Sequence, residues 1–291
     1  MATRDSVARS SWPGRRLTAG LALGGTVFAT ALVAQEVVRQ QAAAARRAIG
    51  KPLGEEALVA DRTYKKKYGD PLDMLLLGDS IAAGLGAETP KHTLGAQLAK
   101  RLARRTGRAV RLHTAAIVGS ETSMLRAQLA GLPSGYSADV AVIVVGGNDV
   151  THRVRTSVAK QHLAEAITAL QEHGTAVVVG TCPDLGALTA VPQPLRALAR
   201  VASRQLAAAQ RDTALELGAY AVSLADVVGP FFLTRPDEMF AVDRFHPSGA
   251  GYRRSAKALL PSVMAALGFD ERLPHGHHPP RRLQVEDPLS R

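Results

Sequence analysis

The chain has 291 residues, enough for one globular domain with further segments at both ends, and its single cysteine, Cys182, excludes an intramolecular disulfide. Its formal net charge of +11 is compatible with nucleic-acid binding, but about half of the excess lies before residue 52, on both sides of an apolar segment. The sequence contains no recognisable nucleic-acid module and few aromatic residues, so we expect no nucleic-acid partner.

The apolar segment is residues 17–34, LTAGLALGGTVFATALVA, which follows Arg15 and Arg16. We interpret residues 1–40 as a basic N-terminus with a single-pass membrane anchor, and we expect the domain that follows it to lie outside the cytoplasm. A cleaved signal peptide that releases a secreted domain and a twin-arginine export signal are alternatives. A cytoplasm-facing domain is a third, because the positive-inside rule is also satisfied by Arg39, Arg46, Arg47 and Lys51.

Residues 41–71 are expected to form a helical extension and a linker, and the domain itself spans residues 72–270. Apolar runs predict strands at Met74–Leu77, Ala109–His113, Val140–Val145, Thr175–Gly180 and Ala219–Ser223. Amphipathic segments between them predict helices at Leu94–Thr106, Ser123–Ala130, Val158–His173, Leu195–Leu217 and Ser248–Leu267. This alternation is typical of an α/β fold, and we expect a flavodoxin-like three-layer α/β/α sandwich around a five-stranded parallel sheet. Residues 271–291 are predicted to be a disordered tail.

Three polar motifs and a glycine fall at the carboxyl ends of strands or just before the last helix. Gly78-Asp79-Ser80 follows the first strand, where a serine at a strand-to-helix turn is well presented for nucleophilic attack. Taken alone, this motif is weak and is better explained by Ser80 capping the helix. Neither a phosphate-binding P-loop nor a dinucleotide fingerprint fits the glycine spacing.

Possible oxyanion donors follow the next two strands. Asn148, in Gly146-Gly147-Asn148-Asp149, offers a side-chain amide at the end of the third strand, and Gly119 offers a backbone N–H after the second. An ordinary Gly-Asn turn is the alternative for Asn148.

Asp243 and His246 stand three residues apart, just before the last predicted helix. This spacing allows the carboxylate to orient the imidazole and stabilise its protonated form. With nine histidines in the chain, a surface His on a capping loop is the alternative.

Along the chain the four blocks stand in the order Ser80, Gly119, Asn148 and His246. In this order they resemble the SGNH hydrolase family, also called GDSL-type lipases and esterases, over roughly residues 73–267. The resemblance implies that Ser80 is the nucleophile, that His246 is its general base and that Asp243 orients His246. It also implies an oxyanion hole made by the N–H of Ser80, Gly119 and Asn148. The second block departs from the family pattern, because Thr114 stands where an Asn usually precedes the glycine by five residues.

The implied activity is hydrolysis of carboxylic esters, of lipid or acylated-glycan type, through an acyl-serine intermediate. It needs no metal ion or organic cofactor, and we expect a monomer that binds a small ester and contacts the membrane through its N-terminal segment. An acyltransferase on the same scaffold and a non-catalytic envelope binding module are the alternatives. The complete catalytic set argues against the binding module. We interpret Cys182 as a packed small residue and expect no metal at the tail histidines His275, His277 and His278.

Overall fold

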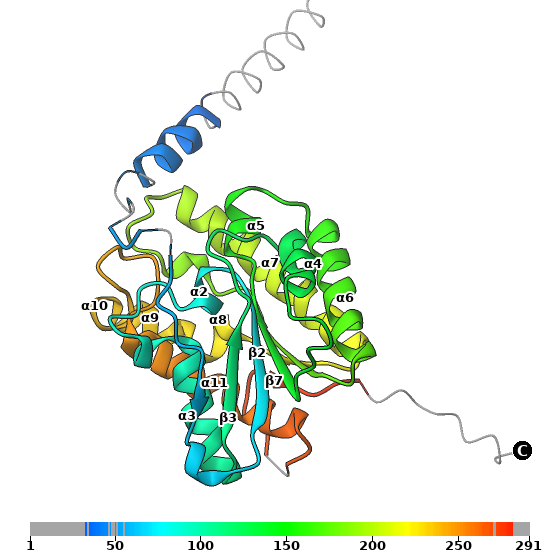
Figure 1. Ribbon diagram of the computed structural model, residues 1–291. Helices are drawn as coiled ribbons and strands as arrows, with labels where there is room; N and C mark the ends of the chain where they lie inside the picture. Colours follow the sequence, from blue (N-terminus) through cyan, green and yellow to red (C-terminus); the bar gives the residue numbers. More distant parts are fainter. Residues whose placement is uncertain are drawn as a thin grey trace, which may run out of the picture.

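The computed structural model describes Val33, residues 35–45, Arg47, Gly50, and residues 52–54, 56–269 and 272–281. Within this part a seven-stranded sheet runs in the order β1-β3-β2-β4-β5-β6-β7 (Figure 1). The strands are β1 (Thr63–Tyr64), β2 (Leu72–Gly78), β3 (Val110–Thr114), β4 (Val140–Val144), β5 (Ala176–Gly180), β6 (Tyr220–Val222) and β7 (His277–His278). β2 to β6 are parallel to one another, whereas β1 and β7 pair antiparallel at the two edges.

The five predicted strands are present, but the prediction of a five-stranded, fully parallel sheet is corrected by the two edge strands. Each edge strand is only two residues long, too short for an alternating pattern to be visible in the sequence. β7 also lies in the segment predicted to be a disordered tail. There it pairs with β6, and His277 and His278 are hydrogen-bonded to Ser262 and Ser223.

The five helices predicted from amphipathic segments are present, most of them with shifted ends. The helix expected at Ser80 is present but short, and four further short helices were not predicted. The five predicted from amphipathic segments are α3 (Leu94–Thr106), α4 (Leu125–Ala130), α6 (Thr156–Glu172), α7 (Leu195–Glu216) and α11 (Gly249–Ala266). The short ones are α2 (Ser80–Ala83), α5 (Gly147–Thr151), α8 (Leu224–Val227), α9 (Gly229–Thr234) and α10 (Pro236–Met239). Single 3₁₀ turns form η1 (Lys66–Tyr68), η2 (Pro90–His92), η3 (Thr122–Met124) and η4 (Leu185–Ala187).

The helices cover both faces of the sheet, so the predicted three-layer arrangement is present (Figure 1). Alternate residues of β2 show why. Met74 and Leu76 are buried on the face covered by α3 and α11, and Leu75 and Leu77 on the face covered by α4, α6 and α7. Both faces of the strand are therefore apolar, and its carboxyl end is where the chain turns polar.

A helix at residues 35–45 contacts the domain on the side where the parallel strands end (Figure 1). Its Ala45 is buried next to Leu185 and Leu188, and the Gln41 side chain is hydrogen-bonded to the backbone of Gln193 and Leu195. The predicted anchor at residues 17–34 lies almost entirely outside the described residues. Among the described residues no helix is long and apolar enough to cross a membrane, and the membrane anchor stays a prediction.

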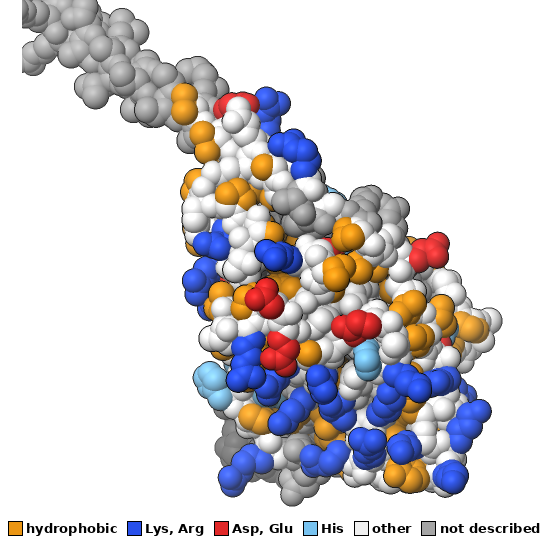
Figure 2. All heavy atoms as spheres, turned by 90° about the vertical axis from the view of Figure 1, so that its left-hand side faces the viewer, with side chains coloured by type: hydrophobic (Ala, Val, Ile, Leu, Met, Phe, Trp, Pro, Cys, Tyr) orange, Lys and Arg blue, Asp and Glu red, His pale blue; other side chains and the backbone are white. Residues whose placement is uncertain are grey.

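Lys and Arg side chains gather on the side of the domain formed by α3 and α11 (Figure 2). Neither helix contains an acidic residue, and together they carry Lys100, Arg101, Arg104, Arg105, Arg253, Arg254 and Lys257. The positive charge of the chain is therefore not confined to its N-terminal segment.

Candidate active site

Ser80 is the first residue of α2, directly after β2. The helix is capped by Asp79, whose Oδ1 accepts a hydrogen bond of 2.9 Å from the N–H of Ile81. The turn requires Gly78, which has a φ of +131° and whose Cβ, if present, would lie 1.9 Å from the carbonyl oxygen of Val144. Capping is thus the role of Asp79, and the Ser80 hydroxyl is left for another partner.

That partner is His246, which lies 166 residues further along the chain. His246 Nε2 is 3.0 Å from Ser80 Oγ, and its Nδ1 is 2.6 Å from Oδ2 of Asp243. Asp243 Oδ1 accepts hydrogen bonds of 3.0 Å from the N–H groups of Phe245 and His246, which fix the carboxylate in place. The structure therefore brings the three residues together in one continuous chain of hydrogen bonds.

The same contacts keep the carboxyl ionised. Burial raises the pKa of Asp243, but hydrogen bonds from the His246 side chain and from the two backbone N–H groups outweigh burial, so its pKa lies below the ordinary value. A carboxylate held in this state stabilises a protonated imidazole beside it.

Asn148 lies in α5 and lines the same pocket as Ser80. Its Nδ2 donates one hydrogen bond of 2.9 Å to the carbonyl oxygen of Ser120, which leaves the second hydrogen of this amide for a ligand. Gly119 precedes Ser120 in a turn with a φ of +84°, and the turn is joined to the Ser80 strand by a bond of 3.1 Å from Ile117 N–H to Gly78 C=O. The predicted donors Gly119 and Asn148 thus follow strands β3 and β4, which flank β2, at the carboxyl ends of the parallel strands.

Gln128 is a supporting residue that the sequence did not reveal. Its buried carboxamide accepts from the N–H of Gly78 at 2.9 Å and donates to the Gly78 carbonyl at 2.8 Å and to Ser120 Oγ at 3.1 Å. One side chain therefore ties the turn before Ser80 to the turn after Gly119. No motif marks it, because a glutamine on an amphipathic helix is ordinary.

A pocket opens beside Ser80, between η4 on one side and α8, α9 and the end of α10 on the other. Polar groups lie at the Ser80 end, where Ser80, Asn148 and His246 meet. Most of the remaining lining is apolar and includes Leu185, Leu188, Leu224, Val228, Phe232 and Phe240.

Comparison with known proteins agrees with this geometry. Residues 76–254 match the model of the GDSL-like lipase/acylhydrolase family, and the matched range includes Ser80, Asn148 and His246. The chain belongs to this family. This GDSL-like hydrolase is 37% identical over 267 residues to the GDSL-like esterase Rv1075c of Mycobacterium tuberculosis, a match that covers 87% of this chain and 85% of the relative. The protein is therefore a carboxylic ester hydrolase.

Solved structures of similar fold include further hydrolases. The lipase Lip_vut3 from a goat rumen metagenome has a TM-score of 0.54 and 20% identity, over 70% of this chain and 100% of that one. TesA has a TM-score of 0.52 and 24% identity, over 67% and 99% of the two chains. A catalytic mutant of Axe2, an acetylxylan esterase from Geobacillus stearothermophilus, has a TM-score of 0.51 and 18% identity, over 69% and 96%. At these identities the comparison establishes the fold.

Cys182 does not compete with Ser80 in this GDSL-like hydrolase. It is fully buried after β5, and burial, followed by the charge of Asp79, raises the pKa of its thiol well above the ordinary value. Its Sγ donates to the Pro183 carbonyl at 3.6 Å. Within the described residues no group of three or more His, Cys, Asp or Glu side chains is arranged to hold a metal ion.

Asp79 should make the stability of the wild type depend on pH. Burial raises its pKa from 3.8 to about 6, so between these values the folded protein holds a proton that the unfolded chain has released. Stability is therefore lost as pH rises through this window, by at most about 3 kcal/mol, and Asp79→Asn should remove the dependence. Urea unfolding at pH about 4.5 and about 7 measures it. A difference in stability between variant and wild type that is the same at both pH values would contradict the expectation.

Proposed function

We propose that this esterase uses Ser80 as its nucleophile, His246 as general base and acid, and Asp243 as the group that orients His246. The observation that carries the proposal is the pair of contacts made by the imidazole, 3.0 Å to Ser80 Oγ and 2.6 Å to Asp243 Oδ2. The donor–acceptor pair and the orienting carboxylate lie at hydrogen-bonding distance, which favours proton transfer from Ser80 to His246 as an ester is attacked.

In the first half of the reaction, Ser80 Oγ attacks the ester carbonyl carbon while its proton passes to His246 Nε2. The carbonyl oxygen becomes an oxyanion, which receives hydrogen bonds from the N–H groups of Ser80 and Gly119 and from Asn148 Nδ2. The tetrahedral intermediate then expels the alkoxide, which takes the proton from His246 and leaves as an alcohol.

In the second half, a water molecule takes the place of the alcohol. It gives a proton to His246 Nε2 and attacks the acyl-serine, and the second tetrahedral intermediate releases the acid as Ser80 recovers its proton. Asp243 keeps its charge throughout and fixes the imidazole ring. Every step uses groups of this chain and water.

Product analysis tests water as the acyl acceptor. With an activated ester and an excess of an acceptor alcohol, we expect free acid as the main product, in an amount equal to the alcohol released from the ester. A new ester of the added alcohol as the main product would instead identify an acyltransferase.

Asn148→Ala should lower kcat about 10²–10³-fold and leave KM nearly unchanged, because the donated hydrogen bond strengthens only as the oxyanion forms. Steady-state kinetics on an activated ester measure both constants. Thr151→Ala is the matched control: Thr151 lies in the same short helix and is exposed. A raised KM with an unchanged kcat would show that Asn148 binds the ground state of the substrate instead.

A further inference from the structure

The pocket beside Ser80 is apolar along most of its length. Leu185, Leu188, Leu224, Val228 and Phe240 are each at most 8% exposed, although they line an opening. Because these side chains are well covered by their neighbours and still line the pocket, the pocket itself is narrow and holds little water. No Lys or Arg of the described residues lines the pocket, so the positive charge of the chain is not available there to bind an anionic group.

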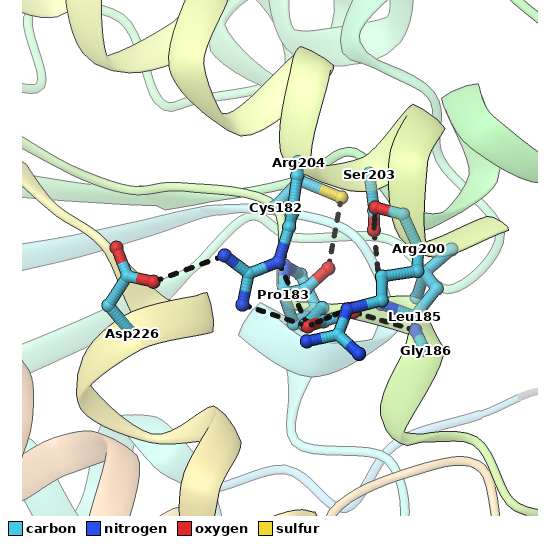
Figure 3. A network of polar contacts seen from close by, with 9 residues as sticks. Cys182, Pro183, Leu185, Gly186, Arg200, Ser203, Arg204 and Asp226 are labelled. Atoms are coloured by element: carbon cyan, nitrogen blue, oxygen red, sulfur yellow. Dashed lines mark hydrogen bonds and ion pairs between the residues drawn. The ribbon is translucent and has the colours of Figure 1, made fainter. Parts of the chain in front are cut away.

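One carboxylate, Asp184, lines the pocket away from the Ser80 end, but its charge is already paired. Asp184 Oδ2 lies 3.0 Å from Arg204 and 3.4 Å from Arg200, and its Oδ1 accepts a bond of 2.8 Å from the N–H of Gly186. Figure 3 shows the two arginines, which belong to α7, converging on the loop that contains Pro183, Leu185 and Gly186. The charge of the Asp184 carboxylate is therefore paired with the two arginines, and this side chain offers the pocket no free anion that would attract a cation.

An ester has an acyl side and an alcohol side, and the apolar lining of the pocket indicates which of the two it binds. The alcohol must leave and water must take its place beside His246, so the alcohol side needs an open path to solvent. A newly formed alcohol or an entering water inside an apolar pocket would lack hydrogen-bond partners, which is costly. The acyl chain, by contrast, stays attached to Ser80 through both half-reactions and gains from contact with apolar walls.

We propose that this pocket binds the hydrocarbon chain of the acyl group, so that the preferred substrates are esters of apolar acids longer than acetic acid. The inference rests on the proposed function, since it takes Ser80 as the acylated residue. Each methylene group buried in the pocket increases kcat/KM roughly fourfold. Among the substrate types open to a serine esterase, the pocket thus favours lipid-type esters over acetylated glycans.

Gly229, the first residue of α9, offers a way to fill the pocket. It is buried, its φ lies outside the left-handed region, and a Cβ added to it would meet a single side chain, Asp184, at 4.0 Å. Gly229 lines the pocket and a Cβ there has room, so a larger side chain at this position takes up pocket space. Gly229→Leu should therefore shorten the space available to an acyl chain.

Two isomeric esters make the test specific. Methyl hexanoate carries its chain on the acyl side and pentyl acetate carries it on the alcohol side, so solubility and total apolar area are matched. In the wild type, kcat/KM should be higher for methyl hexanoate, and Gly229→Leu should lower the ratio of the two values by about tenfold or more. Gly131→Leu is the matched control, because Gly131 also has a negative φ, is exposed and lies outside the pocket.

Each outcome decides one claim. The acyl pocket is overturned if the wild type prefers pentyl acetate, or if Gly229→Leu leaves the ratio of the two kcat/KM values unchanged. If activity still requires Ser80 in that case, the proposed mechanism stays in place. Turnover of both esters by Ser80→Ala overturns the mechanism instead. If Gly229→Leu does not fold, Gly229→Ala replaces it, and a roughly fourfold loss in the ratio is then expected, whereas no loss contradicts the pocket.

Discussion

Ser80→Ala should lower kcat for an activated ester by roughly 10⁴-fold or more while the protein keeps its fold. The Ser80 hydroxyl forms its one side-chain hydrogen bond within the described residues to His246, so its loss removes a nucleophile and leaves the core untouched. The backbone N–H of residue 80 stays in place, and some residual stabilisation of an oxyanion remains with it.

The measurement is steady-state hydrolysis of a nitrophenyl ester together with thermal unfolding. Ser134→Ala is a matched control, because Ser134 is exposed in the loop after α4. A Ser80→Ala variant with a small loss of kcat and an unchanged melting temperature would mean that another group attacks the ester.

His246→Ala should cost nearly as much as Ser80→Ala, because the hydroxyl then has no base at hydrogen-bonding distance. Asp243→Asn should leave roughly 10²-fold more activity than His246→Ala, since the ring is still present but is no longer held in the required tautomer. His173→Ala, at an exposed histidine after α6, controls for the loss of an imidazole. Equal activity in His246→Ala and the wild type would show that another residue is the base.

The sequence predicted the parts of the fold that consist of long regular segments. Residues 74–77 of β2 and the whole of β4 are continuous apolar runs because both of their faces are buried, and α6 and α7 show an apolar stripe over several turns. β1 and β7 escaped prediction because two residues carry no periodicity, and their pairing depends on residues distant in the chain.

The proposed catalytic residues were predicted from their motifs, but their environment was not. Ser80 and His246 are 166 residues apart, and the spacing alone gives no sign that they meet. The walls of the pocket come from η4 and from the short helices α8, α9 and α10, which are too short to show an amphipathic pattern. The role of the Gln128 carboxamide, which joins two turns of the site, is visible only in the structure because no motif surrounds this residue.

In the proposed mechanism Ser80 is the residue acylated during turnover. Covalent labelling with an organophosphonate, followed by peptide mass spectrometry, tests it most directly, because the reagent bonds to the serine that its neighbouring base activates. We expect one phosphonate per chain, located on Ser80, with labelling strongly slowed in His246→Ala. A label on Cys182 or on another serine, accompanied by full loss of esterase activity, would contradict the account.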